Sequence, residues 1–224
     1  PRLHPNVHAF PSGVEIEHYQ RALDASTTIP ADLEEVPHPR IGFFGVIDER
    51  IDLPLLEAVA DARPDWQLIM LGPVKKIAAA DLPQRSNLHY LGQKQYKDLP
   101  GYVKGFDVCM MPFALNDATR FISPTKTLEY MAAHKPIVST PVADVVGSYE
   151  DAVQIVRDTP EFVAAVESAL AETPQDRERR VARERDLLTK STWEAIVAGM
   201  EQRMTEAAGQ RKGASPTRSE GAPL

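Results

Sequence analysis

The 224-residue sequence contains one cysteine, Cys109, so no intrachain disulfide is possible. Cys109 lies in an apolar run, which predicts a small buried side chain rather than a nucleophile. No apolar run approaches the roughly twenty residues needed to cross a bilayer, so we expect no membrane span. The six histidines are scattered without metal-ligand spacing. We therefore expect no metal site and no metal cofactor.

The sequence also lacks an excess of basic over acidic residues. The net charge is -7 and the isoelectric point is near 5.4, which argues against a nucleic-acid partner because such proteins carry a clustered basic face. The hydrophobic content of 43% and the charged content of 25% are those of a soluble globular protein. The chain is long enough to bury one sizeable core. These features predict a cytoplasmic protein.

Short apolar segments alternate with segments of helical periodicity along most of the chain. This alternation predicts βαβ units, and therefore an α/β, Rossmann-like parallel sheet with helices on both faces and further helices at the C-terminus. The predicted strands are Ile41–Val46, Trp66–Gly72, Leu88–Gly92, Asp107–Phe113, Ile137–Thr140 and Val153–Val156.

Composition divides the chain into three parts. Residues 1–40 include a polar, proline-bearing stretch and are predicted to be an interdomain-type segment and linker. Residues 41–207 form the predicted Rossmann-like domain with its C-terminal helices, of which 175–190 is so charged that we expect a solvated surface helix. Residues 208–224 have almost no apolar content and are predicted to be disordered.

The segment 123–140 carries the strongest indication of a site. Ser123 is expected to cap a helix whose first residue is Pro124. Lys126 and Glu129 are three residues apart and so share one helix face. Free amides at a helix start, together with a lysine in its first turn, favour phosphate binding. The alternative is an exposed lysine and a carboxylate that pairs with it.

Further candidates follow the predicted strands, because ligands of open parallel sheets bind beyond the carboxyl ends of the strands. Glycines at these positions let a ligand approach the backbone, although each can also be a simple turn residue. Tyr96 can cover a base or lie at the edge of the core. The glycines are Gly45, Gly72 and Gly92, and the cations are Arg50, Lys75, Lys76 and Arg120.

The stretch SPTKTLEYMAAHKPIVSTP, residues 123–141, resembles the donor-binding segment of GT-B-fold bacterial glycosyltransferases of families one and four. The other predicted strands stand in the order this family has, and the resemblance covers roughly residues 5–205. It implies the C-terminal, donor-binding domain of an enzyme that transfers a sugar from a nucleotide diphosphate sugar, UDP- or GDP-linked, with retention of configuration. A glycan, lipid or protein acceptor is implied, as in the biosynthesis of cell-surface polysaccharide in the cytoplasm or at the inner membrane face.

The resemblance also assigns roles to individual residues. It implies that Glu129 binds the ribose and Lys126 the diphosphate, and these two are the catalytic candidates. The loop Gly92–Tyr96 holds the base, and Gly45 lets the diphosphate approach. The remaining donor-binding candidates are Arg50, Arg120, Ser123 and Thr125.

Three departures from the family pattern limit these implications. Phe121 stands where many of these enzymes have a glutamate that contacts the donor sugar, so Asn116, Asp117 or Arg120 are the alternatives for that role. His134 replaces a glycine and must adopt a left-handed conformation. The resemblance covers only the second of the two Rossmann-like domains of a complete enzyme, so we expect the N-terminal domain to lie outside this sequence. A non-catalytic nucleotide-sugar-binding module and half of a sugar-nucleotide epimerase therefore remain alternatives.

Overall fold

The computed structural model describes residues 7–213, and a parallel six-stranded sheet forms its centre. The strand order is β3-β2-β1-β4-β5-β6, so the order reverses between β1 and β4. The predicted Rossmann-like α/β class is confirmed. The strands are β1 (Arg40–Phe44), β2 (Gln67–Leu71), β3 (Leu88–Gly92), β4 (Val108–Met111), β5 (Ile137–Ser139) and β6 (Gln154–Ile155).

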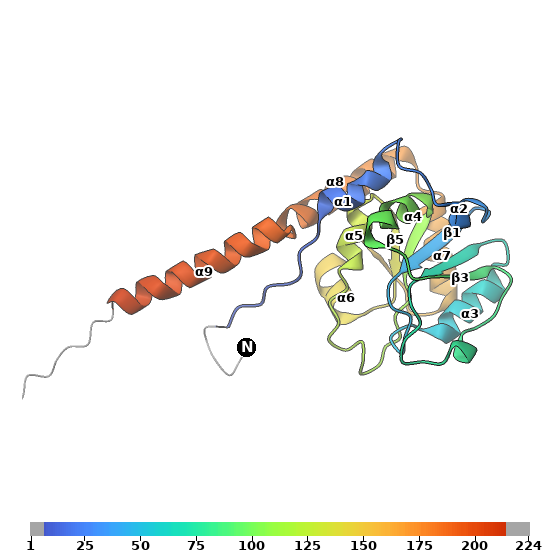
Figure 1. Ribbon diagram of the computed structural model, residues 1–224, viewed down its shortest axis with the longest axis horizontal. Coiled ribbons are helices and arrows are strands. Elements are labelled where there is room, and N and C mark those ends of the chain that lie inside the picture. The colour runs from blue at the N-terminus through green and yellow to red at the C-terminus, as the bar shows by residue number, and fades with distance from the viewer. Residues whose placement is uncertain (1–6, 214–224) are drawn as a thin grey trace, which may run out of the picture.

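Helices cover both faces of this sheet (Figure 1). On one face α3 (Leu53–Ala62) packs against α7 (Thr159–Leu170). On the other, α4 (Leu99–Gly105) and α5 (Lys126–Ala132) pack against α1 (Ile16–Gln20). Central strands are buried on both faces, which is why β4 and all of β1 after Arg40 are apolar. The other helical elements are η1 (Arg21–Leu23), α2 (Ala31–Glu34), η2 (Ala79–Asp81), η3 (Tyr96–Asp98), α6 (Ala143–Tyr149), α8 (Pro174–Lys190) and α9 (Trp193–Gly213).

The segment before the first strand packs onto the Rossmann-like unit, although its composition predicts a linker. Tyr19 in α1 and Leu33 in α2 are fully buried in the common core. Their neighbours in sequence are polar, so only isolated apolar side chains anchor the segment. Composition averaged over such a stretch therefore gives no sign of the packing.

The helix α9 continues to Gly213, beyond the predicted boundary at residue 207. Ala207 and Ala208 are strong helix formers and extend it into the predicted tail. In Figure 1, α9 projects away from the Rossmann-like unit with the N-terminal segment beside its first half. Residues 214–224, the rest of the predicted disordered tail, lie outside the described residues.

Two charged residues of α8 are buried, so the prediction of a wholly solvated helix is wrong for them. Arg180 donates from Nε and Nη2 to Glu172, at 2.7 and 2.9 Å, and from Nη1 to Glu184 Oε1 at 2.9 Å. Arg180 Nη2 also donates to the carbonyl of His134 at 3.2 Å. This network ties α8 to the end of α5, where His134 adopts the left-handed conformation expected of it, with φ of 53°.

Glu184 is expected to make the stability of the protein depend on pH. Burial raises the pKa of Glu184 to about 7, although Arg180 opposes the shift, and Glu184 Oε2 has no hydrogen-bond partner within residues 7–213. The folded state thus holds a proton that the unfolded chain releases near pH 4, so stability falls as the pH rises through about 7. Between pH 5.5 and 8.5, urea unfolding should show a loss larger by about 2 kcal/mol in the wild type than in Glu184→Gln. Equal losses would contradict this account.

Candidate functional site

The helix α5 begins at Lys126, two residues later than the sequence indicates. Thr125 occupies the N-cap position with helical backbone angles and makes no side-chain cap, and Ser123 lies in the preceding loop. The amides of Leu128 and Glu129 donate to the Thr125 carbonyl at 3.0 and 3.1 Å. The predicted Ser123 cap is therefore wrong, and fewer free amides face a ligand than expected. The charge of Lys126 becomes the main attraction for an anion.

Lys126 reaches from α5 across the end of β1. Its Nζ lies 5.6 Å from the centre of the Phe44 ring, a cation–π contact. A Cβ atom at Gly45 would lie 2.5 Å from Lys126 Cε, so only glycine leaves space for this side chain. Burial lowers the pKa of Lys126, with Arg50 adding to the shift and Glu129 opposing it. The glycine expected to admit a diphosphate thus admits the lysine expected to bind one.

A cavity of about 130 Å³ lies between the loops after β1 and β4, where the strand order reverses. Two cations, Arg50 and Lys126, line it together with Ser123 and Thr125. Four of the predicted donor-binding residues therefore share one cavity. The rest of the lining consists of Phe43, Val46, Phe113, Ile122 and Pro124.

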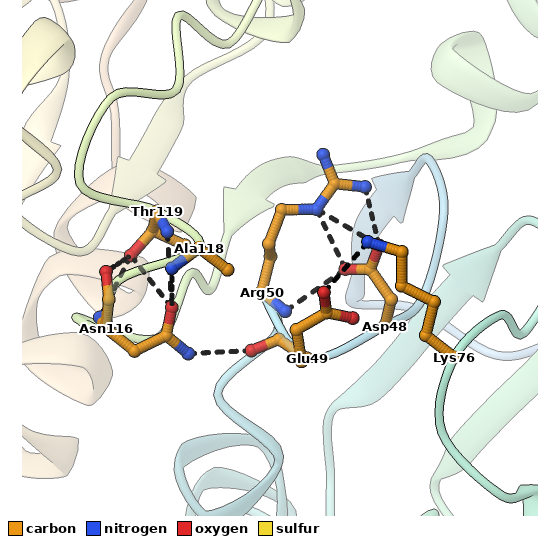
Figure 2. Close-up of polar contacts among 7 residues, drawn as sticks. All are labelled: Asp48, Glu49, Arg50, Lys76, Asn116, Ala118 and Thr119. Atoms are coloured by element: carbon orange, nitrogen blue, oxygen red, sulfur yellow. Dashed lines mark hydrogen bonds and ion pairs between the residues drawn. The ribbon is translucent and has the colours of Figure 1, made fainter.

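Arg50 is held in place by Asp48 (Figure 2). Its Nε donates to Asp48 Oδ1 at 2.9 Å and its Nη2 donates to Oδ2 at 2.7 Å. Burial alone would raise the pKa of Asp48, but the hydrogen bonds and charge of Arg50 lower it. Asp48 is buried and Arg50 is partly exposed. The guanidinium is therefore fixed in orientation, with Nη1 directed away from the carboxylate (Figure 2).

Glu129 lies beside the inner face of α1. The hydroxyls of Tyr19 and Thr125 lie near its carboxylate and act to lower its pKa. Burial raises the pKa of Glu129, while Lys126 and the two hydroxyls oppose the shift. Its Oε2 atom is buried and has no hydrogen-bond partner among the described residues. The described residues therefore leave one oxygen of the Glu129 carboxylate without a hydrogen-bond donor.

Tyr96 lies on the Tyr19 side of Glu129, and Gly92 ends the strand that precedes it. The Tyr96 ring stacks on His18 with centroids 3.9 Å apart, meets Tyr19 edge-on at 6.1 Å, and donates from its hydroxyl to Glu15 at 2.9 Å. One face of the ring predicted to cover a base is therefore taken by His18. Gly92 has a φ of 71° and open space where a Cβ would lie. It is absent from the lining of the Lys126 cavity.

Not every cationic or glycine candidate joins the site. Arg120 is exposed and stacks over the Phe121 ring at 5.2 Å. Lys76 pairs with Glu49 at 2.9 Å, and Gly72 packs against the backbone of Gly45. Asn116, one alternative for contacting the donor sugar, uses its amide on the Glu49 carbonyl at 2.8 Å (Figure 2). These residues build the loops around the cavity.

Sequence reasoning missed Tyr19, His18 and Glu15. All three belong to the segment interpreted as a linker, and they reach the site only through contacts between distant parts of the chain. No sequence motif marks these three residues. The only indication in the sequence is that Tyr19 is a large aromatic residue within an otherwise polar stretch.

The side chains and helices of residues 7–213 bear on metal and membrane binding. No cluster of three or more histidine, cysteine, aspartate or glutamate side chains able to hold a metal ion occurs there. Cys109 is buried in the core, as expected. Within the same residues, no helix is both long and apolar enough to cross a bilayer.

Comparison with known proteins identifies relatives of the whole domain. TuaH of Bacillus subtilis (strain 168), described as a putative teichuronic acid biosynthesis glycosyltransferase, is 27% identical, and the match covers 80% of this chain and 47% of TuaH. The chain thus spans about half the length of the curated relative it matches.

Solved structures show the same fold at low sequence identity. α,α-Trehalose 6-phosphate synthase of Burkholderia multivorans superposes with a TM-score of 0.68 at 17% identity, covering 92% of this chain and 52% of the synthase. HepE (Alr3699) of Anabaena, solved in complex with UDP and glucose, gives 0.61 at 14% identity, covering 90% of this chain and 56% of HepE.

A family description also matches the sequence directly. Residues 38–172, more than half of the chain, match the family described as glycosyl transferases group 1. This range contains every described strand of the sheet, the residues that line the Lys126 cavity, and Glu129. The chain therefore belongs to the group 1 glycosyl transferases and is a domain of the GT-B fold.

Proposed function

We propose that this chain is the donor-binding half of a glycosyltransferase that takes a sugar from a UDP- or GDP-linked donor. The observation that carries the proposal is the order of three features along one edge of the sheet. A cavity with two cations lies at one end, the Glu129 carboxylate follows, and the Tyr96–His18 stack lies beyond it. A nucleotide sugar has its diphosphate, ribose and base in the same order.

The Glu129 carboxylate suits a ribose. Its buried Oε2 has no partner among the described residues, and a buried acceptor of this kind is stabilised once a ligand provides a donor. A ribose diol offers two hydroxyl donors. Tyr19 and Thr125 hold the carboxylate while it accepts from the diol.

Lys126 and Arg50 suit the leaving group. When the bond from the sugar to the diphosphate breaks, negative charge grows on the phosphate oxygens. Fixed cations in a partly buried cavity stabilise that charge more strongly than water does. We propose that these two residues assist departure of the nucleoside diphosphate, and that retention of configuration follows as it does in the enzymes the sequence resembles.

The acceptor belongs to the rest of the enzyme. We propose that a second Rossmann-like domain binds it, since the chain spans about half of TuaH and HepE. The description of TuaH supports a cell-surface polysaccharide as the acceptor. Calorimetric titration of this chain with UDP and with GDP tests the proposal, and we expect one of them to bind in the micromolar range, about 10 µM. Absence of binding by both would refute the assignment.

Replacing Glu129 by glutamine should weaken binding of the preferred nucleoside diphosphate by about tenfold, because a charge-assisted hydrogen bond to the ribose is lost. The analogue with a 2′,3′-dideoxyribose should bind the wild type and Glu129→Gln equally, which separates a ribose contact from a general loss of structure. Exposed Glu178 on α8 provides the matched control, Glu178→Gln. An equal loss for both nucleotides would contradict the ribose role.

The same contact predicts a dependence on pH. Because burial raises the pKa of Glu129, the carboxylate takes up a proton at a higher pH than an exposed glutamate does. Affinity for the nucleoside diphosphate should therefore decline on mild acidification in the wild type and stay flatter in Glu129→Gln.

A further inference from the structure

The loops beside the Lys126 cavity expose large apolar side chains. Phe121 is 85% exposed, and Leu115 on the same loop is 65% exposed. Val46, which lines the cavity, is 38% exposed. Phe121 directly precedes Ile122, another residue of the cavity lining. An apolar rim made of Val46, Phe121 and Ile122 thus adjoins a cavity whose charged residues are cations.

The loop that presents Phe121 is firmly built (Figure 2). Asn116 Oδ1 accepts from the amides of Ala118 and Thr119 at 3.0 and 3.2 Å. The Asn116 side chain also donates to the Glu49 carbonyl at 2.8 Å, which joins this loop to the one after β1. The exposure of Phe121 is therefore held by the structure of the loop.

The Phe121 ring is available for stacking. Arg120 lies over it at 5.2 Å, a contact that uses the negative face of the aromatic ring. Most of the ring surface stays open at 85% exposure. The C–H groups on one face of a pyranose carry a slight positive charge and meet an aromatic face in the same way.

The cavity lining combines cations and hydroxyls with apolar side chains. Among the described residues that line it, none is acidic, so no carboxylate there can accept from sugar hydroxyls. A diphosphate held by Arg50 and Lys126 brings the sugar bonded to it to the mouth of this cavity, where Val46 and Ile122 line the wall. Phe121 and Val46 are the surfaces that a ring at this position meets.

We infer that Phe121 is a specificity-determining residue that stacks on the donor sugar and selects a sugar with an apolar face. This inference rests on the proposed function and extends it from the nucleotide to the sugar. Phe121 contributes to binding of the sugar ring and does not contact the diphosphate.

Calorimetric titration of the 224-residue chain tests the inference. The probes are UDP, GDP, UDP-glucose, UDP-N-acetylglucosamine, GDP-mannose and GDP-fucose. For each variant, the quantity compared is the ratio of Kd for the best-bound sugar nucleotide to Kd for its nucleoside diphosphate. Phe121→Ala should raise this ratio about tenfold while Kd for the diphosphate stays within about twofold. Phe121→Trp should keep the ratio near the wild-type value.

Leu115→Ala is the matched control, because Leu115 is exposed on the same loop but neither of its chain neighbours lines the cavity, whereas Phe121 adjoins Ile122 of the lining. It should leave both constants unchanged. A ratio unchanged in Phe121→Ala, or a parallel rise of both constants, overturns the role of Phe121 and leaves the proposed function standing. Failure of the wild type to bind either diphosphate overturns the proposed function and this inference together.

Discussion

Lys126→Ala should weaken binding of the nucleoside diphosphate between about tenfold and a hundredfold, the range expected for one charge-assisted contact in a shielded site. Lys126 is mostly buried beside Phe44 and Gly45, so water cannot replace its charge at the cavity. Arg50 would then be the one cation of the cavity lining left to face the anion, and its charge is already paired with Asp48. Calorimetric titration of wild type and variant measures the loss.

Lys75→Ala is the matched control, because Lys75 lies on the same edge of the sheet but is exposed and absent from the cavity lining. Its affinity should equal that of the wild type. Affinity in the wild type should also fall as the pH rises through the lowered pKa of Lys126, since the neutral amine attracts no anion. Equal affinities for Lys126→Ala and the wild type would remove Lys126 from the site.

Gly72→Ala should lower the free energy of unfolding by about 3 kcal/mol or more, through backbone strain and overpacking together. The added Cβ would lie 1.8 Å from the carbonyl oxygen of Gly45, and Gly72 has a φ of 142° that only glycine adopts easily. Because backbone lies against backbone, no rotamer change relieves the clash. Urea unfolding followed by circular dichroism measures the loss.

Gly147→Ala provides the comparison for that experiment. A Cβ at Gly147, in the helix α6, meets no atom within 4 Å. The change should leave stability the same or raise it by up to about 1 kcal/mol, because alanine favours the helix. Similar stabilities for Gly72→Ala and Gly147→Ala would contradict the packing of Gly72 against Gly45.

Much of the fold was predictable because the strands are short, largely apolar segments, and three of them end at or just before a glycine: Gly45, Gly72 and Gly92. The pairing of Lys126 with the Gly45 loop was also predictable, since both follow the carboxyl ends of strands that the topology makes neighbours. The helix α6 was not predicted: its seven residues are too few to show a helical period clearly.

Other parts of the site depend on contacts that no local pattern encodes. The start of α5 shifts to Lys126 because Thr125 takes helical angles without a side-chain cap. The burial of Arg180 and Glu184 arises from packing of α8 on α5, which a charged sequence conceals. The contact of Tyr19 with Glu129 joins segments far apart in the chain. Each of these needs the tertiary structure.

The position of Tyr19 has a consequence for exchanging donor specificity between related enzymes. A graft that begins at β1 would transfer Gly45, Arg50, Lys126 and Glu129, but it would leave Tyr19 behind in the recipient's own sequence. The carboxylate of the transplanted glutamate would then lack one of its two hydroxyl partners. The exchangeable unit therefore starts before α1, and recipients that already carry a tyrosine there are the natural hosts for the shorter graft.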